Sequence, residues 1–193
     1  MGGSSLCPDV LRETFGHVEG HPELLVLDST DPAQVAGVAD AVDMARTLFI
    51  VSSKSGSTLE PNILLAFFYQ QVVDAIGEDG AASRFIAITD PGSNLERQAT
   101  DAGFRHIFHG KPQIGGRLSA LSAVRVVPAA IMGLEAGRVL EEAGQMVDAC
   151  GTGSAAGQNP GVVRGTILGV AATQGRDKLT RFASPGIASL GGW

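Results

Sequence analysis

One loop concentrates side chains that could bind an anion. In IVSSKSGSTLEPN, residues 50–62, a short apolar run ends in a loop, and a helical pattern follows at once. The loop offers hydroxyl groups and one positive charge, from Ser53, Lys54, Ser55, Ser57 and Thr58. A strand end followed by a helix start also presents unpaired backbone N–H groups and the positive end of the helix dipole. This combination is typical of a site for a phosphate monoester.

The same loop excludes one ligand class and leaves one alternative open. It does not match GxxxxGK[ST], so no nucleoside triphosphate site is indicated. Gly56 would allow a close backbone approach or a positive φ. The alternative is an ordinary serine-rich turn with Ser57 and Glu60 as a capping box, although Pro61 disfavours helical geometry at Glu60. The position at the carboxyl end of a strand favours the ligand site.

Two further segments combine glycines with polar groups. Residues 1–5, MGGSS, precede an apolar helix that starts near Leu6, and they form either a second phosphate turn or a simple linker. In IGGRLS, residues 114–119, two glycines precede Arg117, which suggests a backbone held close to a ligand with a guanidinium beside it. Arginine can stabilise a developing oxyanion, although a loop arginine is more often a surface residue.

Histidines and cysteines show no metal-site pattern. The four histidines lack a carboxylate or cysteine at ligand spacing, so we expect surface roles for His17, His21, His106 and His109. The two cysteines form no CxxC, which favours a reduced, cytoplasmic protein. Neither a metal nor an organic cofactor is expected.

Composition narrows the function classes further. The chain has 193 residues and a net charge of −6, and no run of Lys and Arg stands out, so we expect no nucleic-acid partner. The longest apolar stretch, residues 63–76, contains Gln70, Gln71 and Asp74, so no membrane span is expected. The N-terminus has neither the basic nor the apolar region of a signal peptide.

Strand and helix patterns alternate along the chain. Short apolar runs predict strands at residues 23–29, 46–53, 84–90 and 104–110. The intervening stretches predict helices, one opening at Asp31-Pro32, one with an apolar stripe along 63–76, and one spanning 93–102. Later segments predict helices at 128–144 and 162–174 and a strand at 178–184. The alternation indicates an α/β fold, a doubly wound parallel sheet flanked by helices.

The small-residue stretch 151–161 is the best linker candidate. We therefore expect a first domain at residues 1–150, with its N-terminal strand missing. Residues 151–193 would contain a linker, a helix and the first strand of a truncated second domain. The opening turn lacks a preceding strand, so we expect a fragment of a longer protein.

The ordered motifs resemble the phosphoglucose isomerase family. They are MGGSSLCP, VSSKSGSTLEP, ITDPGS, IGGRLSALS and VPAA, in the family's order. The likeness is greatest to the isomerase part of fused transaldolase–isomerase proteins, where NPGVV, GRDKLT and SPGIA also have counterparts. The resemblance implies two sugar isomerase domains and interconversion of glucose 6-phosphate and fructose 6-phosphate in glycolysis and gluconeogenesis. It further implies a small-molecule sugar phosphate ligand, a cytoplasmic enzyme, no cofactor and a homodimeric parent protein.

The resemblance also assigns residue roles. It implies a substrate-phosphate site formed by Gly3, Ser4, Ser53, Lys54, Ser55 and Thr58. It implies that Arg117 stabilises the enediolate during proton transfer and that Glu60 is an acidic catalytic residue near the site.

The chain departs from the family at three points. Leu118 replaces the tyrosine of GGRYS, and Val124-Arg125-Val126 replaces a Phe-Gly-Met run. The family's glutamate base, ring-opening histidine and late lysine lie beyond Trp193, so we expect the isolated chain to be inactive. Two other functions stay open: a non-catalytic sugar-phosphate sensor, and a different sugar-phosphate aldose–ketose isomerase.

Overall fold

The structure, a computed structural model, describes residues 3–192, and the Arg117 side chain lies outside that description. The chain divides into two compact units, the first extending to Leu134 and the second spanning Glu135–Gly191. The expected domain division after residue 150 stays a prediction.

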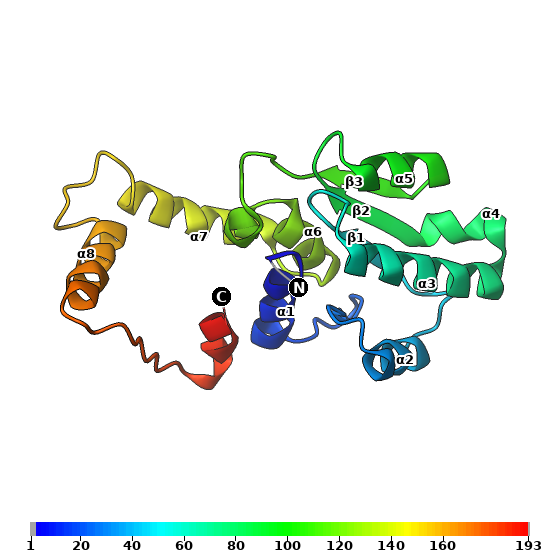
Figure 1. Cartoon of the computed structure of the whole chain (residues 1–193), viewed down its shortest axis with the longest axis horizontal. Coiled ribbons are helices and arrows are strands. Elements are labelled where there is room, and N and C mark those ends of the chain that lie inside the picture. Colours follow the sequence, from blue (N-terminus) through cyan, green and yellow to red (C-terminus); the bar gives the residue numbers. More distant parts are fainter. Residues whose placement is uncertain (1–2, 193) are drawn as a thin grey trace. The chain divides into compact units, whose positions relative to one another are not determined.

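A parallel sheet of three strands forms the centre of the first unit (Figure 1). The strands are β1 (Phe49–Ser52), β2 (Phe85–Thr89) and β3 (His106–His109), in the order β1-β2-β3. Phe49 pairs with Phe85, and Ile86 pairs with His106. All three lie within predicted strands, so the parallel α/β architecture is confirmed. Because the strands are parallel, their carboxyl ends meet at one edge of the sheet.

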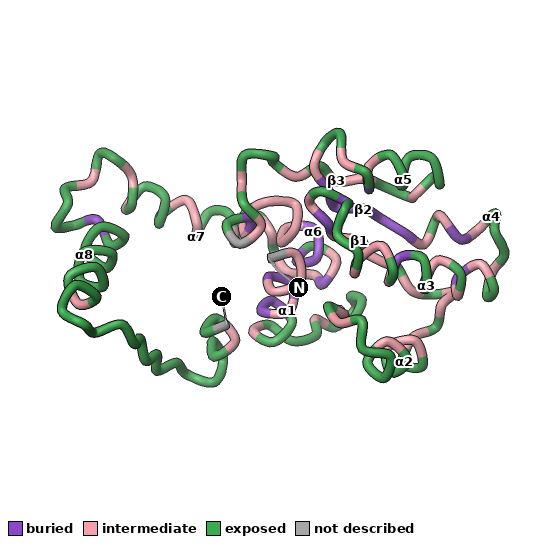
Figure 2. The backbone as a smooth tube through the Cα atoms, viewed as in Figure 1, coloured by how far each residue is buried: buried purple, intermediate pink, exposed green. Residues whose placement is uncertain are grey.

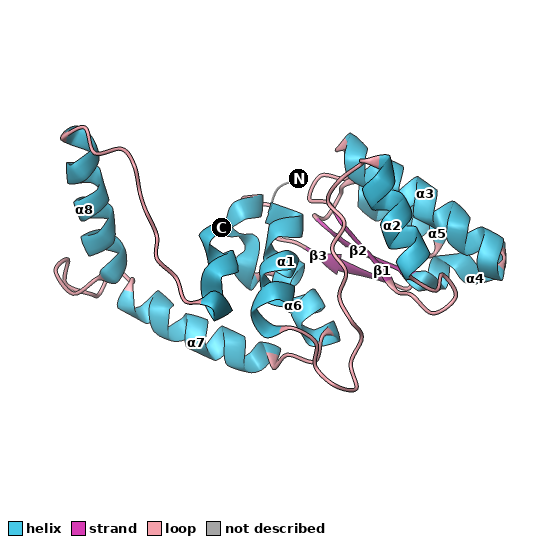
Figure 3. Cartoon of the chain, turned by 90° about the horizontal axis from the view of Figure 1, so that it is seen from below, coloured by secondary structure: helices cyan, strands magenta, loops and turns pink. Residues whose placement is uncertain are grey.

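Helices cover both faces of this sheet (Figure 3). The helices of the first unit are α1 (Gly3–Phe15), α2 (Pro32–Ala41), α3 (Leu59–Ile76), α4 (Glu78–Ala81), α5 (Asn94–Ala102) and α6 (Ala123–Ile131). On one face α3 and α5 pack against the strands, while α6 lies on the other face with α1 against it. Short 3₁₀ turns add η1 (Ala82–Arg84) and η2 (Gly116–Leu121).

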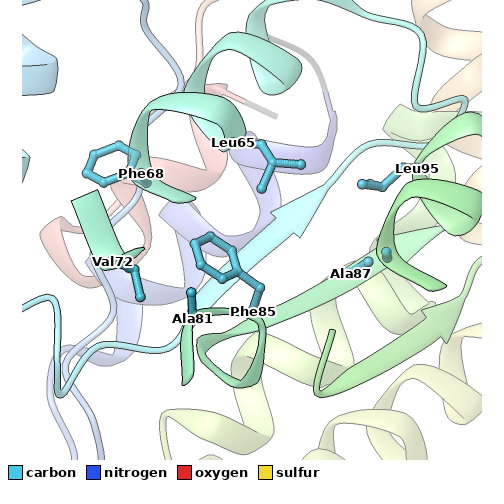
Figure 4. Packing of buried hydrophobic residues seen from close by; sticks show 8 residues of the cluster. Leu65, Phe68, Val72, Ala81, Phe85, Ala87 and Leu95 are labelled. Atoms are coloured by element: carbon cyan, nitrogen blue, oxygen red, sulfur yellow. The ribbon is translucent and has the colours of Figure 1, made fainter. Parts of the chain in front are cut away.

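Alternating side chains of β2 divide the core into two clusters. Phe85 and Ala87 face α3 and α5, where the predicted apolar stripe supplies Leu65, Phe68 and Val72 (Figure 4). On the opposite face, Ile86 and Ile88 form a cluster with Val127 of α6. A strand buried on both faces reads as a continuous apolar run, which is why β2 was recognisable from the sequence.

Three helix boundaries are set by capping residues, of which the Asp31 cap was predicted from the sequence. The Asp31 carboxylate accepts hydrogen bonds from the first-turn amides of α2, and Ser93 Oγ accepts one from Glu96 N at 3.0 Å. Gly103 closes α5 in the left-handed conformation, with φ of 73°. The N-cap of α3 is Thr58, without a side-chain cap bond. The Ser57–Glu60 capping box was therefore wrong.

Two predicted strands are absent from the part of the chain that the structure describes. Residues 23–29 and 178–184 are irregular. An apolar run becomes a strand only when a neighbour pairs with its backbone, and neither segment has such a neighbour among the described residues. Leu24 and Leu27 still pack against the two helical layers, which explains why the first run is apolar.

The predicted helix at residues 128–144 is two helices, α6 and α7 (Ala136–Ala149), with Gly133 between them at φ of 84°. The second unit also contains α8 (Pro160–Thr173) and, except for its last residue, η3 (Pro185–Gly192). Within Glu135–Gly191, Asn159 alone is buried, and Figure 2 shows these elements largely exposed. Among the described helices, none is long and apolar enough to cross a membrane.

A candidate anion site at the carboxyl edge of the sheet

Three segments singled out in the sequence meet at one small cavity. Ser4 in the first turn of α1, Lys54 directly after β1 and Gly116 at the start of η2 all line it. Thr89 and Asp90, at the carboxyl end of β2, also line the cavity. The backbone of Arg117 follows Gly116 within η2, while its side chain lies outside the described residues.

The cavity itself is too small for a sugar. Its volume is about 20 Å³, which is room for about one water molecule. A sugar phosphate therefore does not fit inside it with the loops in this arrangement. The groups available to such a ligand are those on the exposed rim.

The loop between β1 and α3, residues 53–58, has a fixed backbone path. Gly56 has φ of 65° and is buried, and its amide donates a hydrogen bond to Ser53 Oγ at 3.2 Å. The Asn62 side-chain amide donates to the Gly56 carbonyl at 3.2 Å. Thr89 Oγ1 donates to the Lys54 carbonyl at 3.2 Å, which connects the loop to β2. Such preorganisation suits a binding loop.

Of the four hydroxyl groups in this loop, one is buried and three are exposed. Ser53 is buried, and its oxygen is already engaged with Gly56. Ser55, Ser57 and Thr58 are exposed, and the Ser55 and Ser57 hydroxyls lie 2.8 Å apart. These three sit just before α3, a helix of 18 residues whose positive dipole end favours an anion.

Lys54 is the loop's cation, and its ammonium group has three oxygen partners. It forms an ion pair with Asp90 Oδ2 and donates to the carbonyls of Lys111 at 3.2 Å and Pro112 at 3.0 Å. An ammonium group has three N–H donors, so these contacts use all of them. The predicted role of Lys54 as a phosphate ligand stays a prediction, because that role would need it to exchange a partner.

Two other predicted site residues, Gly3 and Glu60, lie in the first turns of helices. Gly3 is the first residue of α1, next to Ser4. Glu60 lies half-buried in the first turn of α3 and is not among the residues that line the cavity. A carboxylate there stabilises the helix through the dipole. The catalytic role of Glu60 stays a prediction.

A hydrogen-bonded pair of side chains near the site was missed from the sequence. His109 Nε2 and Glu96 Oε1 lie 2.6 Å apart, and Glu96 Oε2 accepts a hydrogen bond from Gly92 N at 2.5 Å. The Gly92 amide, and then the His109 contact, lower the pKa of Glu96 below its usual value. The two residues are thirteen positions apart, on α5 and β3, and only the fold brings them together.

The positions that depart from the family pattern have distinct surroundings. Leu118 is 80% exposed, so the packing of the first unit does not depend on a tyrosine there. Arg125 lies in α6 near the buried Cys7. Burial raises the pKa of the Cys7 thiol to about 11, although the Arg125 charge acts to lower it. No group of three or more His, Cys, Asp or Glu that could hold a metal ion occurs among residues 3–192.

Comparison with known sequences identifies the relatives of this chain. The family model described as Phosphoglucose isomerase matches residues 1–182. The glucose-6-phosphate isomerase of Rubrobacter xylanophilus is 31% identical over 155 residues, which are 77% of this chain and 36% of that protein. The enzyme of the same name from Prochlorococcus marinus is 35% identical over 148 residues, 76% of this chain and 28% of that protein.

Two solved structures are similar to this chain in both fold and sequence. A hypothetical protein of Thermus thermophilus matches with a TM-score of 0.81 and 28% identity, over 88% of this chain and 40% of that one. A glucose-6-phosphate isomerase of Chlamydia trachomatis matches with a TM-score of 0.65 and 30% identity, over 77% of this chain and 28% of that one. The chain thus spans about a third of the length of the curated relatives described above.

Proposed function

The chain belongs to the phosphoglucose isomerase family, and we propose that it carries the phosphate-binding half of a site that interconverts glucose 6-phosphate and fructose 6-phosphate. The observation that supports this function is the meeting of Ser4, Lys54 and Gly116 at one cavity, beside the loop that opens α3. These residues come from three distant motifs. A serine-rich turn that merely caps a helix would not bring the other two motifs together.

The phosphate group is held at the rim of this cavity. Ser55 and Thr58 supply exposed hydroxyls, and the first turn of α3 supplies the positive end of a long helix. Ser4 and Gly3 bring the first turn of α1 to the same place. Ser53 and Lys54 belong to the same loop, and their assignment to the phosphate site rests on the family resemblance alone.

The isomerisation step needs groups beyond those that bind the phosphate, namely a base and a cation. An aldose and a ketose interconvert when a base moves a proton between C1 and C2 while a cation stabilises the charge on the oxygens. Arg117, directly after two glycines in η2, is the proposed stabiliser of the enediolate. Glu60 is the proposed acidic group near the phosphate. The family's glutamate base has no matching position in residues 1–193, so we expect binding without turnover.

Binding to the 193-residue chain tests this function directly. Isothermal titration with glucose 6-phosphate, fructose 6-phosphate and unphosphorylated glucose should show binding of the two phosphates alone. The double variant Ser55→Ala/Thr58→Val should weaken binding at least tenfold, because each hydrogen bond to a charged oxygen contributes about 1.5–3 kcal/mol. Ser83→Ala is the matched control, since Ser83 lies in η1 before the amino end of β2.

Equal affinity for glucose and its phosphate, or a double variant that binds as tightly as the unaltered chain, would contradict the proposal. A coupled assay that showed turnover at an enzyme-like rate would contradict the expectation of an inactive chain. In a longer protein that includes this chain, Arg117→Ala separates the enzyme from a sugar-phosphate sensor. Lost turnover with retained binding supports the enzyme, and a panel of sugar phosphates identifies any other aldose–ketose isomerase.

The biological setting follows from this activity. We propose a cytoplasmic enzyme of glycolysis and gluconeogenesis that acts as a homodimer in its longer form. Sedimentation of such a protein tests the dimer.

A further inference from the structure

We propose that Asp90 is a positioning residue for the sugar-phosphate site. It holds the Lys54 ammonium group so that Lys54 fixes residues 111–116 across the carboxyl ends of β1 and β2. This inference rests on the proposed function and assigns Lys54 a different task within it. Lys54 acts as a structural tie, and the phosphate is left to the exposed hydroxyls of the loop.

The hydrogen-bond partners of Lys54 support this structural role. Its ammonium group contacts the Asp90 carboxylate and the carbonyls of Lys111 and Pro112, at 3.2 and 3.0 Å. All three donors are therefore used. A phosphate ligand would need at least one of them, and the Asp90 charge already neutralises the lysine. Lys54 thus joins the end of β1 to the end of β2 and to the loop after β3.

Asp90 is itself held in place. Its backbone amide donates to the Lys54 carbonyl at 3.0 Å, and its own carbonyl accepts from Ser93 N at 3.2 Å. Its side chain is only 17% exposed. Lys54 and Asp90 are therefore connected twice, through the backbone and through the side chains. The Lys54 side chain is 37% exposed, so the pair is half-buried, and the backbone bonds add the constraint that an ion pair on an open surface lacks.

Gly110 provides an independent indication of the same role. A β-carbon on Gly110 would come within 2.6 Å of Asp90 Oδ1. The Gly110 amide donates to the Thr89 carbonyl at 2.7 Å, and this hydrogen bond holds the Gly110 backbone close to Asp90. The absence of a side chain at Gly110 leaves the space that the Asp90 carboxylate occupies.

The tie acts on the segment that leads to Arg117. Ile114 N donates to the Lys111 carbonyl at 3.0 Å, which closes a turn immediately before Gly115 and Gly116. Lys111 and Ile114 line the same cavity as Ser4. Fixing Lys111 and Pro112 therefore fixes the position of the Gly115–Gly116 backbone. That backbone is the part of the site proposed to meet the sugar, beyond the phosphate.

The selectivity for sugar phosphate over inorganic phosphate tests this assignment. Asp90→Asn should reduce the ratio of the Kd for inorganic phosphate to the Kd for glucose 6-phosphate about tenfold, because the segment that meets the sugar loses its fixed position. Loss of one negative charge affects both ligands alike and cancels in the ratio. Asp40→Asn removes the same charge from the exposed surface of α2 and should leave the ratio unchanged.

Three outcomes overturn the inference. One is an unchanged ratio in Asp90→Asn. Another is binding of both ligands by Asp90→Asn that is tighter than the same charge change makes it in Asp40→Asn, which would mean that the released Lys54 is a phosphate ligand. A third is a ratio that falls equally in Asp40→Asn, which would mean that charge alone is responsible.

A second measurement separates this inference from the proposed function. Amide hydrogen exchange at Ile114 reports on the tie without any ligand. Asp90→Asn should speed that exchange about tenfold, and unchanged exchange would overturn the tie. If the unaltered chain bound neither phosphate ligand, the proposed function would fail, while the exchange result would still decide on the role of Asp90.

Discussion

A β-carbon on Gly56 would come within 2.2 Å of the backbone nitrogen of Leu95. The loop after β1 is therefore pressed against the first turn of α5, the helix that follows the next strand. Asn94 N donates to the Ser55 carbonyl at 3.4 Å across the same contact. The candidate phosphate loop thus depends for its shape on residues about forty positions later. This contact makes Gly56 the most sensitive backbone position of the loop.

Gly56→Ala should destabilise the first unit by roughly 2–3 kcal/mol. The substitution adds a clash with backbone atoms to the strain of a positive φ. Urea unfolding followed by circular dichroism measures the change. Gly37→Ala is the matched control, because Gly37 lies within α2 with nothing within 4 Å of an added β-carbon. It should be neutral or stabilising by up to about 1 kcal/mol. Equal effects of the two variants would contradict the close contact.

Ser93→Ala should cost about 1–2 kcal/mol of stability. The Ser93 hydroxyl accepts from Glu96 N at 3.0 Å as the N-cap of α5, and it lies 2.7 Å from Thr89 Oγ1. Ser57→Ala should change stability by less than about 0.5 kcal/mol, because Thr58 and not Ser57 is the N-cap of α3. A larger loss of stability in Ser57→Ala than in Ser93→Ala would favour the alternative that Ser57 and Glu60 form a capping box.

The two cysteines should react at very different rates. Burial raises the pKa of Cys7 to about 11, whereas Cys150 is exposed. At pH 8 the Cys7 thiol is almost entirely protonated, and the thiolate is the reactive form. A disulfide exchange reagent at pH 8 should therefore label one thiol quickly in the folded chain and the second only in denaturant. Cys150→Ser should abolish the fast reaction. Two fast equivalents in the folded chain would contradict the buried position of Cys7.

The pair of Glu96 and His109 should give stability a dependence on acidic pH. The Gly92 amide and His109 lower the pKa of Glu96 in the folded state. A carboxylate with a lowered folded pKa contributes stability above its unfolded pKa, and this contribution is lost as pH falls through the folded pKa. Glu96→Gln should therefore melt below the unaltered chain at pH 7, with the difference shrinking towards pH 3. Exposed Glu78, changed to Gln, is the comparison. A Glu96→Gln difference that stays constant from pH 7 to pH 3 would contradict this account.

Local signals in the sequence predict much of the first unit. The run that became β2 is apolar throughout because both faces of the sheet are covered there, whereas β3 at the edge of the sheet carries the exposed His106 and His109. Asp31, Ser93 and Gly103 mark helix ends by their own chemistry. Strand pairing is not local. Residues 23–29 have a strand's composition and still lack a paired neighbour within the described residues, so composition alone led to a wrong assignment.

The sequence indicated three motifs that meet at the cavity, but not the contacts that they make there. The motifs of Ser4, Lys54 and Gly116 were recognisable by type, and the fold brings them together. A lysine in a serine-rich loop predicts an anion, yet the anion that the structure places beside Lys54 is Asp90. Such a pairing depends on the register of β1 against β2, which the sequence does not display.

The most direct test of the central claim is to map glucose 6-phosphate onto the chain by backbone amide chemical shifts. We expect shifts at the loop of residues 53–58, at Ser4 and at Gly116; of these residues, Ser4, Lys54 and Gly116 line the cavity. Unphosphorylated glucose should leave these amides unchanged. Shifts confined to α7 and α8, or an unchanged spectrum at saturating sugar phosphate, would contradict it.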